Sequence, residues 1–71
     1  MIKPGDLVEI IPAMDQSLYE RSFCGKLGIL VENVSAHRSP NIWKIFVEDQ
    51  FVNMHNLDFK VVQPAKEKNN E

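Results

Sequence analysis

The sequence predicts an all-β fold, a small and strongly bent β-barrel, from two glycine-containing segments and a set of short apolar runs. Gly25 and Gly28 stand three residues apart and lead directly into the apolar residues 29–31. Glycine adopts backbone angles that other residues resist, so the pair indicates a tight turn that feeds a strand. Residues 3–6, which include a Pro-Gly pair, open the first apolar run in the same way.

The first two strands are expected over residues 7–11 and 27–34. Residues 7–11 are rich in β-branched side chains, and strand alternation places Val8 and Ile10 inward. Pro12 has no N–H to donate to a ladder, so the first strand should end there. The second strand contains three consecutive apolar residues. We interpret it as a strand that bends sharply and buries both of its faces in part, as a small barrel requires.

The remaining strands follow at short intervals. Alternation over residues 43–47 puts Trp43 on the buried face and Phe46 on the opposite one. The turn at residues 48–50 has no Asn-Gly or Asp-Gly pair, so we predict a longer turn or a bulge rather than a two-residue hairpin. The last elements are expected to be a strand at 51–53, a helical turn at 54–57 and a strand at 59–62.

The connection between the first two strands, residues 13–24, is long for so small a domain. It is polar around Asp15 and then contains Tyr19 and Phe23. A short helical turn over residues 18–21 fits the sequence, although four residues do not make a stable helix alone. Loops of this length in a compact domain are often functional.

The length of 71 residues allows one domain, which we place at residues 1–62. Residues 63–71 carry polar and charged side chains with little to pack, so we predict a disordered C-terminal tail. A core of this size supplies only about 3–5 kcal/mol of net stability, which argues against a strained catalytic cleft. We therefore expect a protein that is not an enzyme and has no catalytic residues.

Charge and cysteine content limit the partners and the compartment. The net charge is −2, whereas nucleic-acid binding favours a basic surplus. The single cysteine, Cys24, excludes an intrachain disulfide, and small secreted domains commonly carry several. Neither a signal peptide nor a membrane-length apolar segment is recognisable. These features predict a cytoplasmic protein.

Few residues in the chain suit metal or nucleophilic chemistry. Cys24, His37 and His55 lie far apart and make none of the close ligand pairs of zinc sites, so no metal or other cofactor is expected. Cys24 fits a small residue in or near the core. No helix is expected after Gly25 and Gly28, so this pair is a structural turn rather than an anion cradle.

The aromatic residues are the strongest indication of function, because six of them exceed what so small a core can hold. Trp43 and Phe59 are expected in the core, and Phe46 on the outer face. An exposed group formed by Tyr19, Phe23 and Phe46 would mark a protein-binding surface. The alternative is that Tyr19 and Phe23 fold over the mouth of the barrel as a lid.

Five short strands, a long first loop and a helical turn before the last strand resemble an SH3-like barrel. The segments Gly5-Asp6-Leu7-Val8-Glu9-Ile10 and Gly25-x-x-Gly28-Ile29-Leu30-Val31-Glu32 resemble the KOW-type subset of these barrels. Small uncharacterised proteins of tailed bacteriophages have a similar layout, with an N-terminal Pro-Gly-Asp-Leu-Val segment and a C-terminal segment similar to residues 56–62. The resemblance covers residues 1 to about 62. The Ala-Leu-Tyr-Asp-Tyr segment and the tryptophan pair of peptide-binding SH3 domains are missing, so binding of proline-rich peptides is not expected.

Two functions remain open. The first is a protein-interaction module whose long loop and outer sheet face meet a protein partner or a second copy of the chain. An edge strand that pairs with a partner strand is a further route, and the phage resemblance implies an accessory or virion-assembly role. The second, implied by the KOW resemblance, is a binder of RNA, the ribosome or RNA polymerase. Lys26, Arg38 and Lys44 would then contact phosphate.

Overall fold

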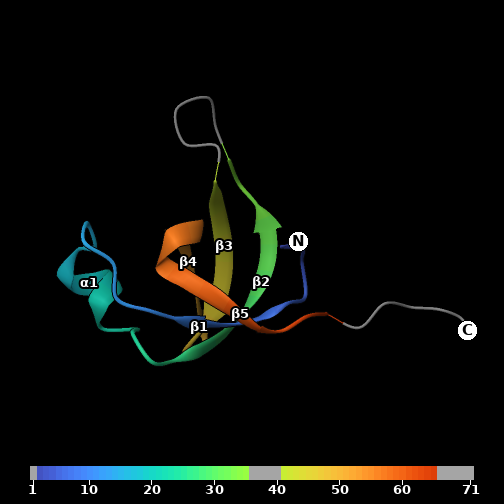
Figure 1. Cartoon of the computed structure of the whole chain (residues 1–71), viewed down its shortest axis with the longest axis horizontal. Coiled ribbons are helices and arrows are strands. Elements are labelled where there is room, and N and C mark those ends of the chain that lie inside the picture. The colour runs from blue at the N-terminus through green and yellow to red at the C-terminus, as the bar shows by residue number, and fades with distance from the viewer. Residues whose placement is uncertain (1, 36–40, 66–71) are drawn as a thin grey trace, which may run out of the picture.

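Five antiparallel strands form one sheet, in the order β4-β3-β2-β1-β5, in the computed structural model of the chain (Figure 1). The structure describes residues 2–35 and 41–65. The elements are β1 (Leu7–Ile10), α1 (Leu18–Arg21), β2 (Leu27–Asn33), β3 (Ile42–Val47), β4 (Gln50–His55), the 3-10 turn η1 (Asn56–Asp58) and β5 (Phe59–Gln63). Within the described ranges no pairing joins β4 to β5, so the sheet is not closed.

The all-β prediction is confirmed, and the predicted elements occur in the predicted order. The largest difference in bounds is β4, which continues to His55 where the sequence predicts an end at residue 53. Its alternation persists because Val52 and Met54 are both buried. The helical turn therefore begins only at Asn56.

The core occupies one face of the sheet. Val8 and Ile10 are fully buried on β1, and Trp43 and Phe59 are buried as predicted. The buried apolar side chains of the described residues are Val8, Ile10, Phe23, Leu30, Trp43, Ile45, Val47, Val52, Met54 and Phe59. All but Phe23 belong to strands, so the long loop contributes a single aromatic ring to the core.

A register shift in β2 accommodates the three consecutive apolar residues. Leu30 pairs with Ile45 and Glu32 pairs with Lys44, which leaves Val31 as the extra residue of a bulge. Leu30 points into the core, while Ile29 and Val31 remain partly exposed on the outside. The bulge is how this strand turns without losing its pairing to β3.

The turn between β3 and β4 is tighter than the sequence predicts. Val47 pairs directly with Gln50, so only two residues form the loop. Both have positive φ, 53° at Glu48 and 64° at Asp49. The prediction of a longer turn or bulge was wrong because the continuous β3–β4 register forces a two-residue connection on residues that do not favour it.

Replacing this turn by Asn-Gly, as the double variant E48N/D49G, is expected to raise the free energy of unfolding by about 1 kcal/mol, since both residues then tolerate positive φ. The loss of the Lys26–Glu48 ion pair, 3.7 Å long and half-exposed, costs little. Urea unfolding monitored by Trp43 fluorescence measures the change. An unchanged or lowered midpoint would show that the turn is not strained.

The C-terminal end of the sheet extends past the predicted domain boundary. β5 includes Gln63, and the N–H of Ala65 donates to Asp6 Oδ1 at 2.7 Å. Within the predicted tail, Gln63 is thus held by its pairing with Leu7, and Ala65 by the buried carboxylate of Asp6. Residues 66–71 lie outside the described residues. No helix in the described part of the chain is long and apolar enough to cross a membrane.

Candidate functional site

A buried glutamine fastens the long loop to the rest of the fold. Gln16 Nε2 donates to the carbonyl of Ile11 at 2.7 Å and to Asp58 Oδ1 at 3.3 Å. Its Oε1 accepts from the N–H of Ala13 at 3.0 Å and from the thiol of Cys24 at 3.6 Å. Each polar atom of the amide has a partner, so its burial is not penalised by an unmade hydrogen bond. The loop is thereby docked on η1.

The helix α1 is short but closed at its N-terminus by a capping box. The N–H of Glu20 donates to Ser17 Oγ at 3.1 Å, and the N–H of Ser17 donates to Glu20 Oε1 at 2.8 Å. Tyr19 connects the helix to the sheet, because its hydroxyl donates to Gln50 Oε1 at 2.9 Å and its ring packs edge-on against Phe23. These contacts hold α1 beside the start of β4.

The turn η1 is fixed from both sides. The N–H of His55 donates to Asp58 Oδ2 at 3.2 Å, and that of Leu57 donates to His55 Nδ1 at 3.1 Å. The N–H of Ile11 donates to the backbone carbonyl of Asp58 at 2.9 Å. The beginning of the long loop and the end of β4 therefore meet at Asp58, which is itself buried.

A hollow of about 570 Å³ lies between these fixed parts. Its lining comes from the long loop, β3, β4 and η1: Ala13, Met14, Asp15, Glu20, Ile42, Asn53, His55, Leu57 and Asp58. Met14 and Leu57 are the most open of its apolar side chains, 94% and 70% exposed. A hollow of this size, lined by both apolar and polar side chains, falls within the size range of ligand-binding sites.

The charge of the hollow has one sign. Asp15, Glu20 and Asp58 bring carboxylates to the lining, and no lysine or arginine among the described residues lines it. In the described part of the chain the ion pairs lie elsewhere: Lys26 with Glu48, Lys44 with Glu32, and Lys60 with Glu9. Among residues 2–35 and 41–65, the acidic side chains of the hollow thus have no cationic partner, whereas Glu9, Glu32 and Glu48 each have one.

One side of the hollow is a strand edge that pairs with no other strand in the described part of the chain. β4 is the terminal strand on its side of the sheet. The N–H of Asn56 bonds back to Asn41, whereas that of His55 turns away to Asp58. Backbone groups alternate in direction along an antiparallel strand, so the N–H and C=O of Asn53 also point away from β3. They are available to an extended chain lying in the hollow.

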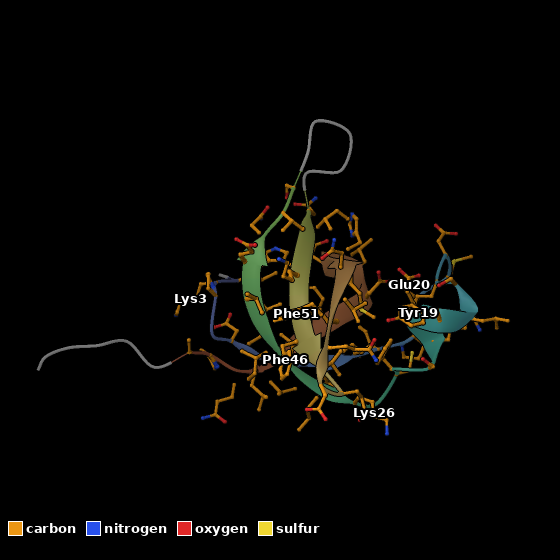
Figure 2. All side chains as sticks on the ribbon, turned by 180° about the vertical axis from the view of Figure 1, so that it is seen from behind. Lys3, Tyr19, Glu20, Lys26, Phe46 and Phe51 are labelled. Carbon is orange, nitrogen blue, oxygen red and sulfur yellow. The ribbon has the colours of Figure 1, made fainter. Side chains whose placement is uncertain are left out.

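The three aromatics predicted to bind a partner do not form one surface. Tyr19 is 55% exposed on α1, and Phe46 is 39% exposed on the outer face of the sheet beside Phe51. Figure 2 shows Tyr19 to one side, near Glu20, and Phe46 with Phe51 over the strands. Phe23 is only 4% exposed. Its expected surface role was wrong, because its ring fills the core beneath Tyr19.

Two of the three basic residues predicted to contact phosphate lie within the described residues, and both are paired with carboxylates. Lys26 is paired with Glu48, and Lys44 lies 3.2 Å from Glu32. Arg38 and His37 lie outside the described residues. Among the residues that are described, no group of three or more histidine, cysteine or acidic side chains could hold a metal ion. Cys24 is half-buried against the core.

Sequence reasoning missed most of the hollow. Asp15 was considered only as loop polarity and His55 only as one of three dispersed candidate metal ligands, and Met14 and Leu57 were not considered as site residues. The one local signal was the Ser-x-x-Glu spacing of Ser17 and Glu20, which marks a helix start within the long loop. The other lining residues come from segments about 40 positions apart in the chain, and only the fold brings them together.

Comparison with known proteins gives no relative: no family model, curated protein or solved structure matches this chain. The hollow and the sheet surfaces are thus the basis for inferring function.

Proposed function

We propose that this chain is a small protein-interaction domain that binds an extended, positively charged segment of a partner protein in the hollow between the long loop, β4 and η1. The observation that carries the proposal is the combination, among the described residues, of carboxylates without an ionic partner, exposed apolar side chains and an open strand edge around one volume of about 570 Å³. The long first loop, a functional candidate in the sequence, provides one wall.

Charge favours a lysine or arginine in the bound segment. Asp15 is exposed at the hollow and has no ionic partner among the described residues. Glu20 is half-buried and uses one carboxylate oxygen in the capping box. A guanidinium or ammonium group between these side chains would supply the missing countercharge. An acidic segment would instead meet repulsion from the same groups.

Apolar and backbone contacts would supply the rest of the affinity. Met14 and Leu57 flank the hollow with flexible, exposed side chains that can cover apolar residues of a partner. The outward N–H and C=O of Asn53 offer main-chain pairing of the kind used when a peptide adds to a sheet edge. An extended segment with alternating apolar and basic residues matches all three features.

We further infer that the sheet is an SH3-like barrel left open between β4 and β5. The order of elements supports this: five short strands, a long connection after the first, a two-residue turn between β3 and β4, and a 3-10 turn before the last strand. The same barrel type is implied by the Gly5 and Gly25–Gly28 segments. One scaffold of this kind serves many functions, so the assignment of function depends on the hollow.

The test is titration of two synthetic decapeptides that alternate valine with arginine or valine with glutamate. We expect the arginine peptide to bind at least about tenfold more tightly, because the hollow is acidic. Asp15→Asn should weaken its binding several-fold, whereas Asp49→Asn, the same change in the β3–β4 turn, should not. Equal affinity for both peptides, or equal effects of the two variants, would contradict the proposal.

The RNA-binding alternative predicts a different titration. Single-stranded and duplex RNA, tested at about 50 and about 200 mM salt, would bind at micromolar concentration and weaken steeply at the higher salt. Because Lys26 and Lys44 are already paired with carboxylates, we expect no such binding. RNA binding that Asp15→Asn leaves unchanged would replace the peptide proposal.

A further inference from the structure

The outer face of the sheet carries an apolar row whose side chains range from half-buried at Leu7 to mostly exposed at Phe51. In the strand register Leu7 lies opposite Ile29, Ile29 opposite Phe46, and Phe46 opposite Phe51. We call these four residues the outer row. Ile29 is 41% and Phe51 62% exposed. Three other exposed apolar side chains of the strands, Leu27, Val31 and Val62, extend the apolar area around it.

The outer row is ordered by its own contacts. The rings of Phe46 and Phe51 lie 5.2 Å apart, and Lys44 Nζ lies 5.6 Å from the centre of the Phe51 ring. Figure 2 shows both rings on the same side of the strands. Side chains that are already packed against each other lose little conformational freedom when a partner covers them.

Opposite charges border the outer row on both of its long sides. Lys44 pairs with Glu32 at 3.2 Å on one side, and Lys60 pairs with Glu9 at 3.8 Å on the other. Each border thus contains one positive and one negative side chain, whose charges cancel. An apolar centre with a polar rim is the usual anatomy of a protein interface. Two identical faces of this kind would not repel each other.

We propose that the outer row is the interface of a homodimer, in which a second copy packs its own outer row face to face. Sheets that pack in this way keep their strand directions within about 30°. The outer row runs across the sheet, roughly perpendicular to the strands. When the strands of two packed sheets differ in direction by about 30°, their two outer rows therefore still lie over one another. The inference is independent of the proposed function, because the row shares no residue with the lining of the hollow.

The size of the face sets the expected strength of the dimer. Typical side-chain areas and the exposed fractions give an apolar patch of roughly 500 Å², in the upper part of the range for monomers. Stable interfaces bury about 800 Å² on each partner. The apolar patch alone is smaller than this, and the interface reaches that area only if the charged side chains at its borders are also buried. We therefore expect reversible association that depends on concentration.

The experiment is sedimentation equilibrium of the full chain from about 10 µM to about 500 µM, the range in which a low-area interface associates. We expect the average mass to rise from 8.2 kDa toward twice that value. Phe51→Glu and Ile29→Lys each place a charge in the outer row and should keep the mass at 8.2 kDa. Leu57→Lys, an exposed apolar side chain of the hollow, is the matched control and should still dimerise.

A wild-type chain that remains monomeric at the highest concentration would overturn the proposal. So would dimerisation unaffected by both outer-row variants, or a mass that rises beyond that of a dimer. Circular dichroism of both variants checks that they fold, and wild-type amide shifts provide a second readout. Those of residues 29, 46 and 51 should change with concentration, whereas those of residues 13–15 should not. If the chain does not dimerise, the peptide-binding proposal is unaffected, because its titration depends on Asp15 and not on the outer row.

Discussion

Gly28→Ala is expected to lower the free energy of unfolding by about 3 kcal/mol, most of the net stability of so small a core. A Cβ at Gly28 would lie 2.7 Å from Ile45 Cγ2, 2.9 Å from the carbonyl oxygen of Phe46 and 3.1 Å from Val47 Cβ. One of these neighbours is backbone, so the clash cannot be relieved by a side-chain rotation. Gly28 is needed because β2 passes so close to β3.

Gly25→Ala is the matched control for this effect. Gly25 has a φ of +86°, and nothing lies within 4 Å of a Cβ placed there. Gly25→Ala is therefore expected to lower the free energy of unfolding by about 1–2 kcal/mol, through the unfavourable backbone angle alone. Urea unfolding of the two variants under the same conditions measures the difference. A smaller loss for Gly28→Ala than for Gly25→Ala would show that β2 can move away from β3 without penalty.

Asp6→Asn is expected to lower the free energy of unfolding by about 2 kcal/mol at neutral pH, because one of its two hydrogen bonds loses its acceptor and the other loses its charge. The buried carboxylate accepts the N–H of Ala65 at 2.7 Å and that of Lys3 at 3.0 Å. It thereby joins the two ends of the described fold. Asp15→Asn, at an exposed position, serves as the control and should change the stability little.

The same carboxylate gives a pH dependence of defined sign. Burial raises the pKa of Asp6, but the hydrogen bonds from Ala65 and Lys3 and the positive charge of Lys3 outweigh it, so the pKa is lowered from its ordinary 3.8. A group with a lowered folded pKa stabilises the fold above its unfolded pKa and ceases to do so as the pH falls through the folded value. The stability difference between the parent and Asp6→Asn should be full at pH 7 and shrink below about pH 4. A difference that is constant across this range would contradict the assigned role.

The strands of the sheet were predictable because their signals are local. The β-branched run ending at Pro12 and the alternation around Trp43 place β1 and β3 to within a residue. The β3–β4 turn was not predictable, because Glu48 and Asp49 adopt positive φ only since the β3–β4 pairing leaves two residues for the connection. Whether the sheet closes into a barrel was equally beyond local signals, since closure depends on how two strands distant in sequence meet.

The candidate site was less predictable than the fold, because its contacts join residues that are distant in the sequence. Gln16 looks like ordinary loop polarity, yet it is the residue that ties the long loop to Asp58, 42 positions later. Phe23 and Tyr19 are close in sequence, but one faces the core and the other the solvent. The outward position of Phe46 was predictable, because strand alternation alone determines it.

The most direct test of the central claim, that the hollow is the binding site, is amide shift mapping of the wild-type chain during titration with the arginine peptide. We predict that the perturbed amides cluster at residues 13–20 and 53–58, the two sides of the hollow. The outer-row residues Ile29 and Phe46 should keep their shifts at constant protein concentration. Perturbations centred on the outer row, with residues 13–20 unchanged, would contradict the claim.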